Sequence, residues 1–219
     1  GADDFDADGD GRDDRMVDLS NAPQFVMQLQ PIGNNYGNAL QGLAVDVEQD
    51  EIWMSVDTSS FYENVLINRL SLQSGNTQYC EEYKESAGLG LGHGQDLSIE
   101  YSDTGERILW IGSTSDRGVT RIEPESKTMN VLSNLLPSGW SHSTPSMGLN
   151  NQWIAVRGTK DGDASNNDWI RIYDKEEIEL GFTSAIAPSP LYEFNIAPEQ
   201  RVDDMWFQGL GLDEEAGFV

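Results

Sequence analysis

The chain has very little cysteine and histidine: its 219 residues include one cysteine, Cys80, and two histidines, His93 and His142. A single cysteine cannot form an intrachain disulfide, and it excludes a metal site built on cysteines. With two histidines and no G-x-S-x-G element, zinc hydrolysis and serine catalysis lack the groups that they need. These absences favour a binding protein over an enzyme.

Basic residues are also scarce, with 13 Lys and Arg against 38 Asp and Glu, so the formal net charge is −25. Such a field repels phosphate backbones, and no nucleic-acid partner is expected. The field favours cations and neutral or basic ligands. The sequence also has no run of about 18 apolar residues, so no membrane-spanning helix is expected.

Much of the acidic charge lies in residues 3–14, "DDFDADGDGRDD". Oxygen ligands at alternate positions can face one hard cation, and a glycine at the sixth position permits the sharp turn. Read from Asp6, that glycine is Gly11, and the twelfth position is Val17 instead of the Glu of an EF-hand. The predicted Ca²⁺ ligands are Asp6, Asp8, Asp10 and Asp14, with Asp4 opening a second register.

This loop resembles the calcium loop of FG-GAP or VCBS repeats, although Arg15 follows its last aspartate. The resemblance implies a structural Ca²⁺ that orders the N-terminal arm. The alternative is a solvated acidic leader with no metal. Residues 1–20 are therefore assigned to an acidic calcium-binding leader, and residues 21–219 to the main domain.

The main domain repeats a hexapeptide that begins with polar, small and Leu or Met positions and alternates apolar residues as a strand requires. Its four copies are "QGLAVD" (41–46), "QDLSIE" (95–100), "PSMGLN" (145–150) and "QGLGLD" (208–213). A second strand with a tryptophan follows the first three copies, at 52–56, 109–113 and 153–157. A third strand with an arginine follows at 67–72, 119–124 and 169–174, and a weaker fourth at 77–83, 128–134 and 190–196.

Four short antiparallel strands, recurring along the chain, predict an all-β fold of the β-propeller type. An irregular β-sandwich is the alternative. Three full blades fit within 41–196, and 208–213 opens a fourth. Residues 23–31 are expected to be a lone outer strand that joins the last blade. The propeller is therefore expected to be incomplete at its C-terminus, with about five blades when complete, the missing part being cut away or carried on a second chain.

The residues that enter the first strand of each blade gather at one mouth of a propeller. Gln41, Gln95 and Gln208 hold equivalent positions there, and His93 and His142 lie just before equivalent strands. Amides and imidazoles both donate and accept hydrogen bonds, which suits a hydroxyl-rich ligand. Trp140 and Trp206 lie close to these entries and are candidates to stack on a sugar ring.

The recurring arginines and second-strand tryptophans have a different interpretation. Arg69, Arg121 and Arg171 are equivalent in the repeat, as are Trp53, Trp110 and Trp153. A residue type that recurs in every blade indicates architecture, so we expect these side chains to pack between blades.

Three short motifs support a family resemblance: Gln41-Gly42, Gly92-His93-Gly94-Gln95 and Trp110-Ile111-Gly112. With these, residues 38–219 resemble the β-propeller of helveticin-type bacteriocins, C-type teichoic-acid biosynthesis proteins and some phage receptor-binding proteins. The resemblance implies a secreted or cell-surface module that acts on bacterial wall polymers, with His93, Gln95 and Gln41 as the matched site residues.

Three functions follow from the sequence. The first is a secreted, calcium-stabilised β-propeller that binds a cell-surface glycan or wall polymer without catalysis, as a bacteriocin-like or receptor-binding module. The second is a propeller enzyme that cleaves a polysaccharide or lactone, with His93 as general acid or base. The third is a structural module of a larger adhesin or multi-chain assembly.

Overall fold

Three antiparallel sheets, each of four strands, make up most of the described structure. The computed structural model describes residues 39–46, 48–57, 64–84, 91, 94–112, 117–148, 150–160, 168–184 and 186–196. The acidic leader (1–20), the predicted strand at 23–31 and the fourth hexapeptide (208–213) lie outside these ranges. An all-β fold of repeated four-stranded sheets is confirmed.

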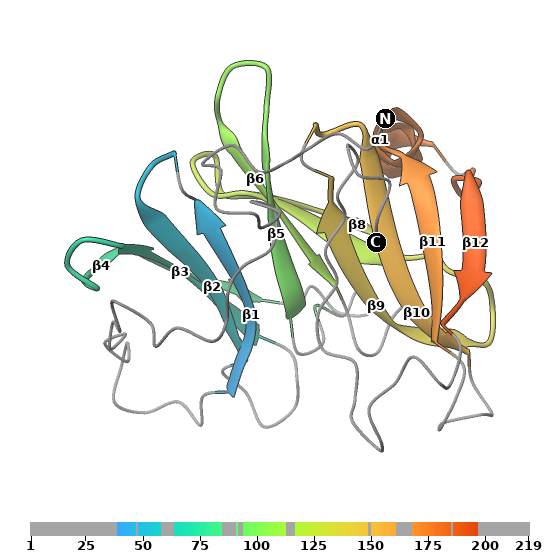
Figure 1. The fold of residues 1–219 in the computed structure, drawn as a ribbon, viewed down its shortest axis with the longest axis horizontal. Coiled ribbons are helices and arrows are strands. Elements are labelled where there is room, and N and C mark those ends of the chain that lie inside the picture. The colour runs from blue at the N-terminus through green and yellow to red at the C-terminus, as the bar shows by residue number, and fades with distance from the viewer. Residues whose placement is uncertain are drawn as a thin grey trace, which may run out of the picture.

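Each sheet follows chain order from one edge to the other (Figure 1). Sheet A consists of β1 (Ala39–Asp46), β2 (Glu51–Asp57), β3 (Asn64–Ser71) and β4 (Thr77–Lys84). Sheet B consists of β5 (Gln95–Tyr101), β6 (Arg107–Gly112), β7 (Val119–Glu123) and β8 (Thr128–Leu132). Sheet C consists of β9 (Trp140–Met147), β10 (Trp153–Lys160), β11 (Asp168–Asp174) and β12 (Tyr192–Asn195).

All twelve predicted strands of the three full repeats are present. They form because they are rich in β-branched and aromatic residues, and the second strands β2, β6 and β10 are nearly continuous apolar runs because they are buried on both faces. A short polar turn connects β5 to β6, and in it Gly105 adopts a φ of 80° that only glycine reaches without strain.

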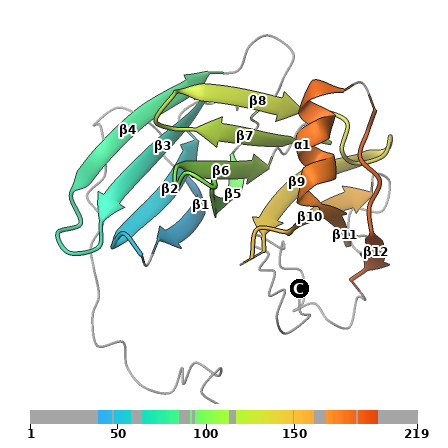
Figure 2. The same ribbon diagram turned by 90° about the horizontal axis from the view of Figure 1, so that it is seen from above.

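The sheets are arranged side by side as a fan (Figure 2). The first strands contact one another, β1 with β5 and β5 with β9, and the fourth strands β4 and β8 lie at the periphery. Trp53, Val65 and Ile67 of sheet A form one apolar cluster with Leu97 and Ile111 of sheet B.

A second apolar cluster joins sheets B and C. Trp110 and Ile108 of sheet B pack there against Ile154, Val156 and Tyr173 of sheet C. Trp53 and Trp110 are both fully buried, so each contributes about 2 to 3 kcal/mol of burial free energy to its interface. Both tryptophans therefore pack between sheets, as predicted.

The strand register corrects the alignment of the third repeat. Arg69 pairs with Trp53 and Arg121 pairs with Trp110, whereas Arg171 pairs with Val156. Trp153 lies opposite Asp174, at the end of the hairpin, so the predicted equivalence of Trp153 with the other two tryptophans is wrong. An aromatic residue in a strand identifies the strand but not its position in the ladder. Trp153 lies in one cluster with Ala155, two residues further along, and a shift of two residues keeps the alternation of faces.

The register also corrects the third hexapeptide, 145–150. Strand β9 ends at Met147, and Asn150 lies in the turn that follows. Pro145 pairs with Val156, which faces the preceding sheet, whereas Ala44 and Ser98 pair with Trp53 and Trp110, which face the next sheet. The third repeat is therefore offset from the predicted alignment.

One helix was not predicted: α1 (Lys175–Thr183), between β11 and β12. Its N-cap is Asp174, whose carboxylate accepts a hydrogen bond from the Glu176 amide, and acidic residues in the first turn complement the helix dipole. Among the described residues, no helix is long and apolar enough to span a membrane.

Candidate functional site

The candidate site lies where the first strands of the three sheets begin, because these strands are the ones that meet between sheets. Sheets A and B approach closely at Gly42: a Cβ atom added there would lie 2.5 Å from the carbonyl carbon of Asp96. The Ser55 hydroxyl donates a hydrogen bond of 2.8 Å to the Gly94 carbonyl oxygen across the same interface. Backbone contact at a glycine fixes the separation of the two strands.

Sheets B and C are joined in a similar way. The backbone amide of Met147 in β9 donates to the Ser98 hydroxyl of β5 at 3.1 Å. The Ser143 hydroxyl of β9 donates to the Gly118 carbonyl oxygen, which precedes β7. A Cβ atom at Gly112 would collide with the Ser143 backbone. The entries of the three first strands are therefore held together by backbone packing.

Each first strand is irregular near its start. The register shifts between Leu40 and Gly42 in β1, between Gln95 and Leu97 in β5, and between Ser141 and Thr144 in β9. Such β-bulges re-aim side chains and recur next to functional sites.

Two residues at these bulges have left-handed backbone conformations. The φ of Asp96 is 55° and that of His142 is 57°. The Asp96 carboxylate accepts a hydrogen bond of 2.8 Å from the Leu97 amide, which offsets part of the strain. A non-glycine residue with positive φ costs on the order of 1 kcal/mol and marks a conformation imposed by its surroundings.

Three of the predicted ligand-binding residues lie at or beside these bulges. Gln41 is the bulged residue of β1, Gln95 precedes the bulged residue Asp96 of β5, and His142 lies within the bulge of β9. The register does not make the three positions equivalent, because Gln95 is paired with Gly112 whereas Gln41 is unpaired. All three side chains are half-buried. The His142 ring nitrogen Nδ1 lies 2.7 Å from the Ser141 hydroxyl.

Most of the other predicted residues are not tested by the described structure. His93, Gln208 and Trp206 lie outside the described residues, as do the predicted Ca²⁺ ligands Asp4, Asp6, Asp8, Asp10 and Asp14. In the part of the chain that the structure describes, no group of His, Cys, Asp and Glu side chains is arranged to hold a metal ion.

Trp140 packs in the core between sheets B and C. It is 8% exposed, lies next to the Trp169 ring at 5.8 Å between centroids, and has the Arg171 guanidinium 4.9 Å from its own ring centroid. Its ring faces are occupied by protein, so it is left out of the ligand-binding set below.

The opposite ends of the first strands carry buried carboxylates, which sequence reasoning did not single out. Asp46 ends β1 and is 3% exposed, and its carboxylate accepts a hydrogen bond of 3.2 Å from Arg107 Nε at the start of β6. The same guanidinium contacts Glu51 at 3.1 Å. Burial lowers the pKa of Arg107, but the Asp46, Glu51 and Glu125 carboxylates outweigh it and hold the pKa above its ordinary value.

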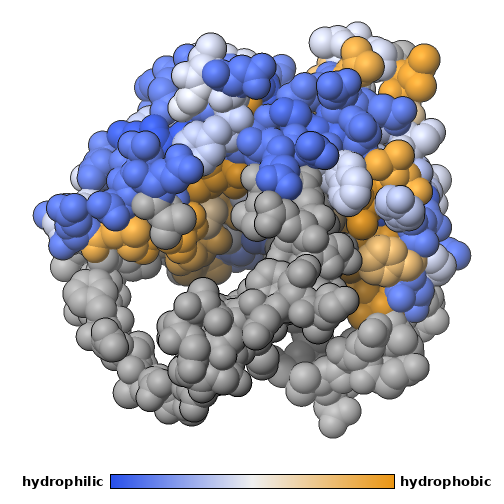
Figure 3. All heavy atoms as spheres, turned by 45° about the horizontal axis from the view of Figure 1, so that its top comes forward, coloured by the Kyte–Doolittle hydropathy of each residue, from blue (hydrophilic) through white to orange (hydrophobic). Residues whose placement is uncertain are grey.

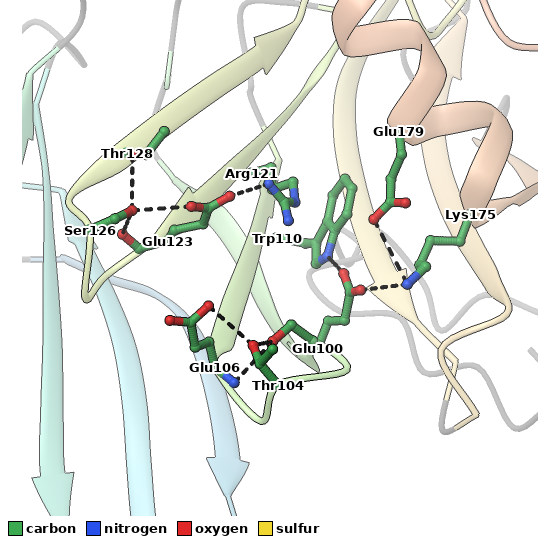
Figure 4. Close-up of polar contacts among 11 residues, drawn as sticks. Glu100, Thr104, Glu106, Trp110, Arg121, Glu123, Ser126, Thr128, Lys175 and Glu179 are labelled. Atoms are coloured by element: carbon green, nitrogen blue, oxygen red, sulfur yellow. Dashed lines mark hydrogen bonds and ion pairs between the residues drawn. The ribbon is translucent and has the colours of Figure 1, made fainter.

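Glu100 takes the place of Asp46 in sheet B. It is 1% exposed, accepts a hydrogen bond of 2.7 Å from Trp110 Nε1, and lies 2.7 Å from Lys175 Nζ (Figure 4). Lys175 belongs to α1, so the ion pair connects sheet B to the helix of sheet C. Burial lowers the pKa of Lys175, but the hydrogen bond to Glu100 and the charges of Glu100 and Glu179 raise it above the ordinary value.

The two ends of the first strands thus differ in chemistry. One end carries amide and imidazole side chains at bulges, and the other carries carboxylates that are neutralised by cations of the next sheet. The sequence signal that could have identified the carboxylates of Asp46 and Glu100 is the acidic residue at the end of the first and second hexapeptides. No model of a protein family matches the chain, and no curated protein sequence matches it significantly.

Proposed function

We propose that the three sheets are blades of a β-propeller and that the bulged entries of its first strands bind a cell-surface glycan or cell-wall polymer without catalysis. The position of Gln41, Gln95 and His142 at or beside the bulges of three successive first strands carries this proposal. Polar residues at the bulged entries of adjoining sheets suit a ligand that spans several sheets, and a polymer of similar units is such a ligand.

The chemistry of the three side chains favours hydroxyl groups as ligands. An amide presents two donors and an acceptor, and a neutral imidazole presents one of each, so both can match a sugar hydroxyl that donates and accepts. The net charge of −25 disfavours an anionic ligand and leaves a neutral glycan as the better fit. An anionic wall polymer would need bridging cations.

Calcium and secretion belong to the same proposal. A Ca²⁺ held by the aspartates of residues 3–14 would remove the repulsion among them and order the segment before sheet A. Calcium is available outside cells, so a protein stabilised in this way would act as a secreted or surface-exposed module, in the manner of the wall-binding propellers that the chain resembles.

The proposal is tested by binding to arrays of glycans and purified wall polymers. Single substitutions Gln41→Ala, Gln95→Ala and His142→Ala should each weaken binding at least tenfold. The matched control is Gln49→Ala, because Gln49 is exposed in the turn at the opposite end of β1 and contributes only its backbone amide to a hydrogen bond there. Unfolding by urea monitors the fold of every variant.

Two outcomes would overturn the proposal. Binding that is unchanged in all three folded variants would remove the site from the strand entries. Release of soluble product from a bound polymer, lost in a folded His142→Ala variant, would replace binding by catalysis.

A further inference from the structure

In each sheet of this protein, the face turned toward the preceding sheet is called the front face, and the face turned toward the next sheet is called the back face. The front face of sheet B includes Leu97 and Ile99 of its first strand. The back face of sheet A, on which they pack, includes Trp53, Val65 and Ile67. Both described interfaces therefore follow one geometry, front on back, with first strand against first strand.

Sheet C also has an apolar back face. Ala155 of β10 and Ile170 and Ile172 of β11 form a separate cluster with Trp153 and Ile196. These residues alternate with Ile154, Val156 and Tyr173, which face sheet B. An antiparallel sheet at the end of an array has a polar outer face, whereas a sheet that is apolar on both faces lies in an interior position.

The back face of sheet C is buried although no described element packs across it. The exposed fractions of Ala155, Ile170 and Ile172 are 0%, 4% and 7%. Among the described residues, those that cluster with Ala155, Ile170 and Ile172 come from sheet C itself or directly follow β12. Helix α1 lies on the other face, because Ile178 belongs to the cluster between sheets B and C. Other residues must therefore cover the back face.

The front face of sheet A gives the contrast. Leu43 and Val45 of β1 are the equivalents of Leu97 and Ile99, and they are 43% and 51% exposed. Leu97 is 3% exposed because sheet A covers it. Hydrophobic surface is visible on the flank of sheet A, below a hydrophilic rim (Figure 3).

We infer that residues 208–213, "QGLGLD", form the first strand of a fourth sheet and cover the back face of sheet C. Their sequence repeats the pattern of β1 and β5, with Leu210 and Leu212 at the places of Leu97 and Ile99. The aliphatic pair would face Ala155, Ile170 and Ile172 as the pair in β5 faces sheet A.

The length of the connection agrees with this assignment. Between sheets A and B the chain runs from Lys84 to Gln95 before the hexapeptide begins. After sheet C it runs from Asn195 to Gln208, a connection of similar length. A chain that crosses to the next sheet in the same way twice is expected to do so again, because each crossing buries one more apolar face.

Amide hydrogen exchange on the full chain tests the inference. The double substitution Leu210→Gln/Leu212→Gln should lower the protection of β10 and β11 at least tenfold and leave β2 and β3 unchanged. Leu180→Gln is the control, since Leu180 is an exposed leucine of α1 at 64%. Leu210→Ala and Leu212→Ala, tested singly, serve if the double variant does not fold.

Unchanged protection of β10 and β11 in the folded Leu210 and Leu212 variants would overturn the inference. The main alternative is that a second copy of the chain binds to the back face of sheet C, and sedimentation velocity detects such a dimer. If dilution dissociates the dimer and the protection of β10 and β11 is then lost, the second copy covers this face, and the inference is overturned.

Discussion

The Glu100 carboxylate of β5 lies 2.7 Å from the Lys175 ammonium of α1, and at the same distance it accepts the indole N–H of Trp110. Two of these residues belong to sheet B and one to the helix of sheet C. The buried acid thus fixes the orientation of the Trp110 ring and connects two sheets. Asp46 and Arg107 connect sheets A and B in the same manner.

Replacing Lys175 by Met should destabilise the protein by about 3 kcal/mol, because a buried carboxylate that loses its partner keeps its desolvation penalty. Urea unfolding measures the change. Glu100→Gln in the same background should recover part of the loss, since the amide oxygen can still accept from Trp110.

The control for this pair is Lys127→Met. Lys127 lies 2.9 Å from Glu81, but both side chains are much more exposed than those of Glu100 and Lys175. Solvent screens such a pair, so its loss should change the unfolding free energy little. Equal losses in Lys127→Met and Lys175→Met would contradict the structural role of the buried pair.

Gly42→Ala should cost more stability than Gly105→Ala. A Cβ at Gly42 would lie 2.5 Å from Asp96 backbone and 2.7 Å from the Ser55 hydroxyl, so sheets A and B must separate, at a cost of about 3 kcal/mol. At Gly105 the space is open, and only the strain of its φ of 80° opposes alanine, on the order of 1 kcal/mol. Thermal unfolding of the two variants makes the comparison.

The Gly42 variant also links the fold to the proposed site, because this contact adjoins Gln41 and Gln95. A Gly42→Ala protein that still folds should lose binding at strand entries as the sheets move apart. If Gly42→Ala lowers stability but leaves binding unchanged, binding does not depend on the interface between sheets A and B.

The strands and their grouping could be predicted from sequence because alternation and turn residues are local signals that recur in each repeat. The third repeat shows where these signals end. Trp153 resembles Trp53 and Trp110 in its neighbours along the chain, yet it lies opposite Asp174 instead of Arg171. Register depends on cross-strand packing, which local sequence does not encode uniquely.

The candidate site was predictable in part for the same reason. Gln41 and Gln95 stand out because they open repeated hexapeptides, and His142 because it precedes the third one, but the bulges at these places depend on the strand register, which the hexapeptides do not reveal. The ion pairs Asp46–Arg107 and Glu100–Lys175 join residues far apart in the chain. Helix α1 had a local signal, the N-cap residue Asp174 followed by Glu176 and Glu177 in the first turn. Capping of this kind favours a helix even between two strands.

Alkaline pH should destabilise the protein. Burial raises the pKa of Tyr79, Tyr83, Tyr101 and Tyr173 above the ordinary value, and the contact with Tyr79 adds to the rise at Tyr83. An unfolded tyrosine loses its proton near pH 10, at about its ordinary pKa. Above that pH the unfolded state binds fewer protons than the folded state, so the free energy of unfolding falls as pH rises.

The urea concentration at the midpoint of unfolding, measured at several pH values from about 8 to about 12, reports this effect, because this range spans the ordinary pKa of tyrosine. The buried tyrosines should lose their protons only as the protein unfolds. Their tyrosinate absorbance, followed in the same samples, should therefore rise together with unfolding. Tyr83→Phe should reduce the dependence on pH. A urea midpoint that stays constant through the ionisation of the tyrosines would contradict the prediction.

Calcium should bind to the aspartates of residues 3–14, which lie outside the described structure. Titration calorimetry of the full chain should show heat with Ca²⁺ that is lost in Asp8→Ala/Asp10→Ala. Glu48→Ala/Asp103→Ala is the matched control, because it removes two exposed carboxylates from turns and changes the net charge equally. Seven aspartates within twelve positions repel one another, so a divalent cation bound there gains more than it would from scattered carboxylates. Equal heats from both double variants would mean that calcium responds to the net charge and not to the aspartate loop.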